Sequence, residues 1–371
     1  MTVRLIASTL ALFVTLHAFA GDIQRRLYVA TPGIRDYLQY GGHGLLVFDI
    51  DQGHRFLKRI PTQGLGGDGN PENVKGICAS AGTGLLHLST LSKLQCLDLR
   101  TEKVVWEKSY PGGCDRMALS PDGRTMYLPT LEKSDWHVID AVSGEEKGVI
   151  SPGSGAHNTV WGPLDQAVYC AGLRSPLLTL ADPAKPAILR TVGPFSAPIR
   201  PFTVNGSESL VFCCVNGLLG FEVGDLKTGR MVHRIGIQGT PLPVKRHGCP
   251  SHGIALSPNE KEIWVTAGHD QKIHVFDATV MPPTYRRAIG VRDEPGWITF
   301  SIDGTLVWPS TGEVIDAATY KIVGALTDEK NTPVMSEKLI EIDFRDGAPV
   351  RAGCQFGVGR VPPAVRSASA F

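Results

Sequence analysis

Residues 254–267 read Ile-Ala-Leu-Ser-Pro-Asn-Glu-Lys-Glu-Ile-Trp-Val-Thr-Ala, and residues 273–278 read Ile-His-Val-Phe-Asp-Ala. This stretch predicts a strand, a Ser-Pro-Asn turn, a second strand, a polar hairpin at residues 268–272 and a third strand ending in Asp. A fourth strand is expected at residues 285–289. Four short strands joined by tight turns form a unit that cannot bury its apolar faces alone, so copies of it are expected elsewhere in the chain.

Related units recur along the chain. A close copy begins at Met117 with Met-Ala-Leu-Ser-Pro-Asp-Gly, and further copies begin at residues 77, 159, 202 and 298. Successive starts lie 40 to 52 residues apart, which is the period of four-stranded propeller blades. The sequence therefore predicts an all-β, seven-bladed β-propeller with six complete blades.

The seventh blade is expected to combine both ends of the chain. Residues 27–31 match the second strand of a unit and residues 45–50 match the third, so an inner strand is missing there. Residues 338–344, Lys-Leu-Ile-Glu-Ile-Asp-Phe, are strand-like and can supply it. Closing the ring in this way removes the open sheet edges. Six or eight blades stay open as alternatives, because residues 328–360 are hard to align with the repeat.

The stretch Ser-His-Gly-Ile-Ala-Leu-Ser-Pro-Asn (251–259), with Ile-Trp-Val-Thr-Ala (263–267), resembles the YVTN-type repeat family of bacterial secreted and surface propellers. It is also similar to the broader group of lactonase-like and quinoprotein-associated propellers. The signature tetrapeptide is altered to Tyr-Leu-Pro-Thr at 127–130 and to Tyr-Cys-Ala-Gly at 169–172. The resemblance implies the fold and leaves the function open, because one fold hosts many functions.

The first twenty residues have the pattern of a secretory signal peptide. Arg4 precedes an apolar stretch at residues 5–19, and Ala18-Phe19-Ala20 forms a small-x-small cleavage site before Gly21. The stretch is too short to span a bilayer well and polar residues interrupt it. We therefore expect a signal peptide at 1–20, a single propeller domain at 21–371, a periplasmic or extracellular location, and no membrane span after cleavage.

Composition and motifs narrow the function classes. The chain has 37 Lys and Arg against 36 Asp and Glu. Its net charge therefore creates no strong electrostatic field that would favour nucleic acid as a partner. Neither a Rossmann fingerprint nor a P-loop is present, and no motif calls for a cofactor. The eight cysteines include no C-x-x-C pair and their spacing fixes no disulfide pattern. A monomer without a cofactor is expected.

Candidate site residues come from repeat position. The loops that lead into the inner strands of a propeller open on one face, so residues about forty positions apart converge there. The residues predicted to bind a ligand at this face are Lys75, Arg116, His157, Arg200, His252 and Trp297. Three cations held close without equal acidic partners favour an anion between them, and Trp297 can stack on a flat group.

The ligand class stays open at this stage. The predicted partner is a small anionic or carbohydrate ligand, or a protein, bound at the face where these loops converge. The alternative is a propeller enzyme, either a polysaccharide lyase or a metal-dependent hydrolase. A lyase needs a cation for the substrate carboxylate and a base such as His. His247-x-Cys249-x-x-His252 offers metal donors, but the pattern matches no established spacing, and no metal is expected.

Overall fold

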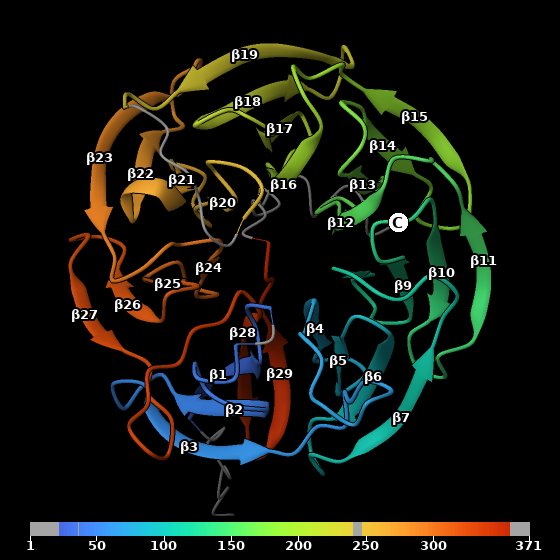
Figure 1. The fold of residues 1–371 in the computed structure, drawn as a ribbon, viewed down its shortest axis with the longest axis vertical. Helices are drawn as coiled ribbons and strands as arrows, with labels where there is room; N and C mark the ends of the chain where they lie inside the picture. The colour runs from blue at the N-terminus through green and yellow to red at the C-terminus, as the bar shows by residue number, and fades with distance from the viewer. Residues whose placement is uncertain (1–21, 36, 240–246, 357–371) are drawn as a thin grey trace, which may run out of the picture.

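The computed structural model describes residues 22–35, 37–239 and 247–356, and seven antiparallel sheets form a ring within these residues (Figure 1). This arrangement confirms the predicted seven-bladed, all-β propeller. The predicted signal peptide at residues 1–20 lies outside the described residues. In the part of the chain that is described, no helix is long and apolar enough to cross a membrane.

Six blades follow one another along the chain, each with its strands in sequence order across the sheet. The second blade contains β4 (Gly76–Ser80), β5 (Leu85–Ser89), β6 (Lys93–Asp98) and β7 (Val104–Ser109). The third contains β8 (Ala118–Leu119), β9 (Thr125–Pro129), β10 (Trp136–Asp140) and β11 (Glu146–Ile150). The fourth contains β12 (Ala156–Trp161), β13 (Val168–Gly172), β14 (Leu178–Ala181) and β15 (Ile188–Val192). The fifth blade contains β16 (Ile199–Val204), β17 (Leu210–Val215), β18 (Gly220–Asp225) and β19 (Arg230–Gly236). The sixth contains β20 (Ile254–Leu256), β21 (Glu262–Ala267), the 3-10 turn η1 (Gly268–Asp270), β22 (Lys272–Asp277) and β23 (Thr284–Gly290). The seventh contains β24 (Ile298–Phe300), β25 (Leu306–Pro309), β26 (Glu313–Asp316) and β27 (Ile322–Ala325).

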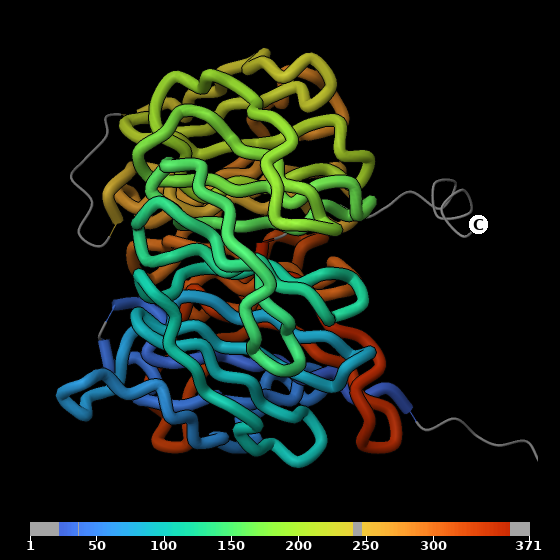
Figure 2. The backbone as a smooth tube through the Cα atoms, turned by 90° about the vertical axis from the view of Figure 1, so that its right-hand side faces the viewer, coloured from blue at the N-terminus to red at the C-terminus, as the bar shows by residue number. Residues whose placement is uncertain are grey.

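The first blade is built from both ends of the described chain. Its strands are β1 (Gln24–Thr31), β2 (Gly44–Asp49), β3 (Arg55–Ile60), β28 (Leu339–Arg345) and β29 (Ala348–Ala352). Strand β28 pairs antiparallel with β1, as expected for the missing inner strand. Figure 2 shows the ring from its edge, with the first strands in blue and the C-terminal strands in red at the same end. The sequence did not predict β29, which makes this blade five-stranded.

The repeated Ser-x-Asp turn has the same hydrogen bonds in different blades. In the third blade the Ser120 hydroxyl donates to Asp122 at 2.6 Å, and the Thr125 amide donates back to the Ser120 oxygen at 2.9 Å. Gly123 follows at φ +73°, where a side chain would be strained. Ser257 with Asn259, and Ser301 with Asp303, make the matching hydroxyl bonds. These turns connect the inner two strands in the third, sixth and seventh blades.

The hydrophobic core lies between neighbouring blades. Tyr28, Val47 and Ile340 of the first blade contact one apolar cluster with Ile77 and Leu86 of the second, and all five side chains are buried. Similar clusters join other neighbours around the ring. Because each sheet is covered by the next blade, inner strands such as β20 and β24 are buried on both faces. This rigid ring holds the loops at its centre in place.

Candidate functional site

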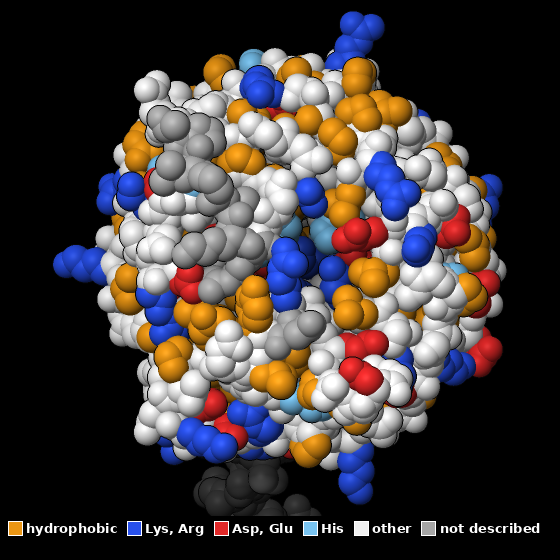
Figure 3. Space-filling model, in the orientation of Figure 1, with side chains coloured by type: hydrophobic (Ala, Val, Ile, Leu, Met, Phe, Trp, Pro, Cys, Tyr) orange, Lys and Arg blue, Asp and Glu red, His pale blue; other side chains and the backbone are white. Residues whose placement is uncertain are grey.

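A cavity of about 620 Å³ opens at the centre of the ring, on the face where the loops into the inner strands converge. Basic and imidazole side chains gather around the hollow centre of this face (Figure 3). The lining residues that carry charge or can titrate are Arg35, Lys75, Arg116, Glu132, Lys133, His157, Arg174, Arg200, His247, His252, Glu337 and Lys338. Seven of them are Lys or Arg and two are Glu, so the cavity wall is strongly cationic.

Five of the six predicted ligand residues line this cavity: Lys75, Arg116, His157, Arg200 and His252. Trp297 does not. Its side chain is buried, its indole N–H donates to the Gln355 carbonyl at 2.5 Å, and the Arg116 guanidinium lies 3.7 Å above its ring centroid. Trp297 therefore acts as a platform that holds Arg116 by a cation–π contact.

Irregular pairing turns two of these side chains toward the centre. The register of β12 against β13 shifts between Ala156 and Asn158, which leaves His157 as an extra residue. The register of β16 against β17 shifts between Ile199 and Phe202, across Arg200. Bulges of this kind re-aim side chains. In both blades the inner strand begins three residues before the start that the repeat predicted, at Ala156 instead of 159 and at Ile199 instead of 202.

His157 is fixed by a buried carboxylate. Its Nδ1 lies 2.6 Å from an Asp115 oxygen. The other Asp115 oxygen accepts the Arg116 amide at 2.9 Å and lies 3.5 Å from the Lys75 ammonium. Burial raises the pKa of Asp115, but His157, Lys75 and Arg116 outweigh it and lower the pKa overall. Burial lowers the pKa of His157, although Asp115 opposes the shift.

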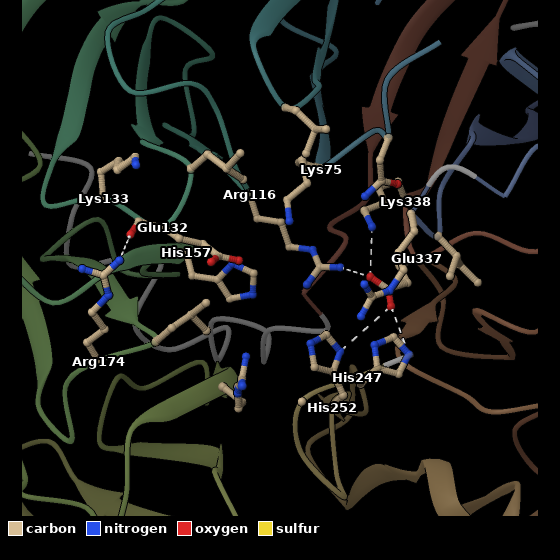
Figure 4. A pocket seen from close by; sticks show the side chains of 18 of the residues that line it. Lys75, Arg116, Glu132, Lys133, His157, Arg174, His247, His252, Glu337 and Lys338 are labelled. Atoms are coloured by element: carbon tan, nitrogen blue, oxygen red, sulfur yellow. Dashed lines mark hydrogen bonds and ion pairs between the residues drawn. The ribbon is translucent and has the colours of Figure 1, made fainter. Parts of the chain in front are cut away.

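A second network centres on Glu337, a residue that no sequence pattern singled out. One Glu337 oxygen accepts hydrogen bonds from Arg116 and, at 2.9 Å, from Lys338. The other lies 3.5 Å from Nε2 of His247 and 4.0 Å from Nδ1 of His252 (Figure 4). The sequence predicted three cations without equal acidic partners. That prediction does not hold for Arg116, which pairs with Glu337, or for Lys75, which lies near Asp115.

The Glu337 network is buried, and its titration is shifted. Burial would raise the pKa of Glu337, but Lys338, Arg116 and the two histidines hold it well below its usual range. Burial lowers the pKa of Lys338 to about 7. The rings of His247 and His252 stack at 4.2 Å between centroids, and burial lowers the pKa of both. Burial in this wall therefore favours the neutral form of both imidazoles.

Metal-donor atoms of His247, His252 and Glu337 lie within 4.8 Å of one another. Cys249, which the sequence pattern offered as a donor, instead directs its thiol to the Ser251 carbonyl at 2.9 Å. Nδ1 of His252 lies 3.1 Å from the Gly296 carbonyl, and two cations already neutralise Glu337. A metal ion would have to displace these partners. The three residues are therefore arranged as an ion-pair network around the Glu337 carboxylate.

The outer part of the cavity holds cations without acidic partners among the described residues. Arg200 donates from Nε to the Asn216 side-chain oxygen at 2.6 Å, and Arg174 donates to the Glu132 carbonyl at 2.9 Å. Lys133 lines the same wall. None of the three forms an ion pair with a residue in the described part of the chain. Their positive charge is therefore available to a bound anion.

No family model and no curated protein matches this chain. Among solved structures, the dihydro-heme d1 dehydrogenase NirN in complex with DHE is similar at 15% identity and a TM-score of 0.59, over 88% of this chain and 72% of that one. The hydrazine synthase of Kuenenia stuttgartiensis is similar at 15% identity and a TM-score of 0.46, over 68% of this chain and 95% of that one. At this identity, the similarity to NirN shows the propeller fold and no function.

Proposed function

We propose that this chain binds a small molecule with two or more anionic groups in its central cavity. The observation that carries the proposal is the excess of seven Lys and Arg over two Glu in one wall. Cations held close together repel one another, and an anion between them relieves that repulsion. Arginine also offers a planar fork that suits a carboxylate or phosphate.

The shape of the site favours a small molecule over a protein partner. A volume of about 620 Å³ lies within the roughly 300–1,000 Å³ of typical ligand pockets. A protein partner would be expected to use a flatter surface. A fold-level parallel supports a bound ligand, since the structure of NirN is described as a complex with DHE.

A second candidate function is an enzyme that uses His157 as a general base. The observation that favours it is the hydrogen bond between His157 and the buried Asp115, because a carboxylate on Nδ1 fixes the tautomer that leaves Nε2 free to accept a proton. A lyase acting on an acidic sugar, with the cations holding the substrate carboxylate, fits this arrangement. Metal-dependent hydrolysis has less support, since one Glu337 oxygen already pairs with both Arg116 and Lys338.

We expect Arg200→Ala to weaken the binding of citrate about ten- to a hundredfold, because a hydrogen bond to a charged group contributes roughly 1.5–3 kcal/mol. Isothermal titration calorimetry at low ionic strength measures the affinity. The matched control is Arg230→Ala, an exposed arginine at the start of the outer strand β19, which should bind citrate like the wild type. Absence of binding to the wild type by citrate, galacturonate and sugar phosphates alike would overturn the proposal.

We also propose that the chain is exported, on the strength of the pattern at residues 1–20. Intact-mass measurement of protein made in a bacterial host and recovered from the periplasm should give a chain that begins at Gly21. The control is a chain with Ala18 and Ala20 both changed to Arg, which blocks the small-residue cleavage site and should keep the full mass. A wild-type chain of full mass in the membrane fraction would contradict cleavage.

A further inference from the structure

His157 presents a hydrogen-bond acceptor to a cavity whose wall is otherwise rich in donors. Its Nδ1 faces the Asp115 carboxylate at 2.6 Å. An ionised carboxylate only accepts hydrogen bonds, so the ring proton lies on Nδ1 and Nε2 carries the lone pair. Nε2 is buried and has no hydrogen-bond partner among the described residues. Figure 4 shows the His157 ring directed toward the space between Arg116 and His252.

Arg116 lies beside His157 with unused donors. An isolated bridge pairs Arg116 with Asn158, which brings the inner edges of the third and fourth blades together. One Arg116 nitrogen bonds Glu337, while Nε and Nη1 are buried without a partner among the described residues. A buried donor or acceptor that stays unsatisfied costs about 1–3 kcal/mol. These groups therefore point to a ligand that accepts hydrogen bonds from Arg116 and donates one to Nε2 of His157.

A second acceptor lies in the same wall. Asn73 lines the cavity, is buried, and has a side-chain oxygen without a hydrogen-bond partner among the described residues. A ligand made only of carboxylates offers no donor to this oxygen or to Nε2 of His157. A hydroxyl group offers one, and it can sit next to a carboxylate on the same carbon skeleton.

We propose that the ligand of the central cavity is a hydroxycarboxylic acid, whose carboxylate accepts hydrogen bonds from Arg116 and whose neighbouring hydroxyl donates to Nε2 of His157. This inference rests on the proposed function, since it names the class of anion that the same cavity binds. It assigns His157 to ligand specificity, because a site built to pair a hydroxyl discriminates against the analogue that lacks it.

Two matched pairs of ligands test the inference. L-Malate differs from succinate, and citrate from tricarballylate, by one hydroxyl on the same skeleton with the same number of carboxylates. At pH 7.5, calorimetry should show each hydroxy acid binding about three- to tenfold more tightly than its partner, as expected for one net hydrogen bond. Equal affinities within both pairs, or tighter binding of the acids without a hydroxyl, overturn the inference and leave the polyanion site standing. Absence of any binding overturns both.

Variants of His157 separate recognition from folding. His157→Leu should remove the preference, so that each hydroxy acid and its partner without the hydroxyl bind with affinities within about twofold of each other. His157→Gln supplies an acceptor oxygen near the place of Nε2 and keeps a donor for Asp115, so part of the preference should remain. The control is His233→Leu in the outer strand β19, which should bind like the wild type. A preference that persists unchanged in a folded His157→Leu variant overturns the inference.

Discussion

A chain truncated after Met335 is expected to lose cooperative folding. The truncation removes β28, which pairs with β1 at six positions, and it removes the buried side chains of Leu339, Ile340, Ile342 and Phe344. The inner edge of β1 would then be open, and an unpaired apolar edge invites association with other chains. Circular dichroism during heating should show no sharp transition, and size-exclusion chromatography should show aggregates.

Single substitutions in the same segment control for the loss of chain length. Ile342→Asp places a charge in a fully buried position of β28 and should unfold the protein or cost several kcal/mol. Val350→Asp makes the same chemical change at a half-exposed position of β29 and should cost little. A truncated chain that melts like the full-length protein, or equal effects of the two substitutions, would contradict ring closure by β28.

Most of the fold could be predicted because each blade repeats one local pattern. The turn at Ser257 and its counterpart at Ser120 mark the same place in two units, so both inner hairpins were placed correctly. Strand β29 follows the last unit, has no counterpart in other blades, and has a mixed pattern of burial. A strand without a repeated partner and without strict alternation gives no signal that distinguishes it from a loop.

The candidate site could be predicted in part for the same reason. His157, Arg200 and His252 precede inner strands, so the repeat itself placed them at one face. Glu337 also precedes an inner strand, but it lies in the segment that could not be aligned, where the repeat gave no reference point. The contact of Trp297 with Arg116 depends on packing between the seventh and third blades across the centre of the ring. No pattern within a single blade contains that information.

The position of Glu337 decides how the cationic cavity is held together. Arg116 precedes β8 of the third blade, Lys338 precedes β28 of the first blade, and both side chains are almost fully buried. A buried charge without a partner is strongly unfavourable, so each cation depends on the one carboxylate. The segment that closes the ring thus supplies the carboxylate that neutralises Arg116 and Lys338. The outer cations, such as Arg200, remain available to bind the ligand.

Glu337→Gln is therefore expected to lower the free energy of unfolding by about 3–5 kcal/mol, the usual cost of leaving a buried ionic partner uncompensated. Urea unfolding at pH 7 measures the change. The matched control is Glu145→Gln, whose partner is Lys108 and whose side chain is 74% exposed. That substitution should cost less than about 1 kcal/mol, because surface ion pairs contribute little. Equal effects of the two substitutions would contradict a central role for Glu337.

The ionised Glu337 side chain also predicts that the stability of the protein depends on pH. Lys338, Arg116 and the neighbouring histidines outweigh burial and hold the pKa of Glu337 in the folded protein well below its usual range, while an unfolded glutamate has a pKa of about 4.3. Stability from the carboxylate is thus fully present above about pH 5 and is lost as the pH falls from there through the folded pKa. Glu337→Gln lacks this titration, whereas the other carboxylates titrate in both proteins. Because Glu337 becomes protonated in this range, the difference in unfolding free energy between wild type and variant should narrow progressively between pH 5 and 3. A difference that stays constant down to pH 3 would mean that Glu337 is not held as a carboxylate by the cations around it.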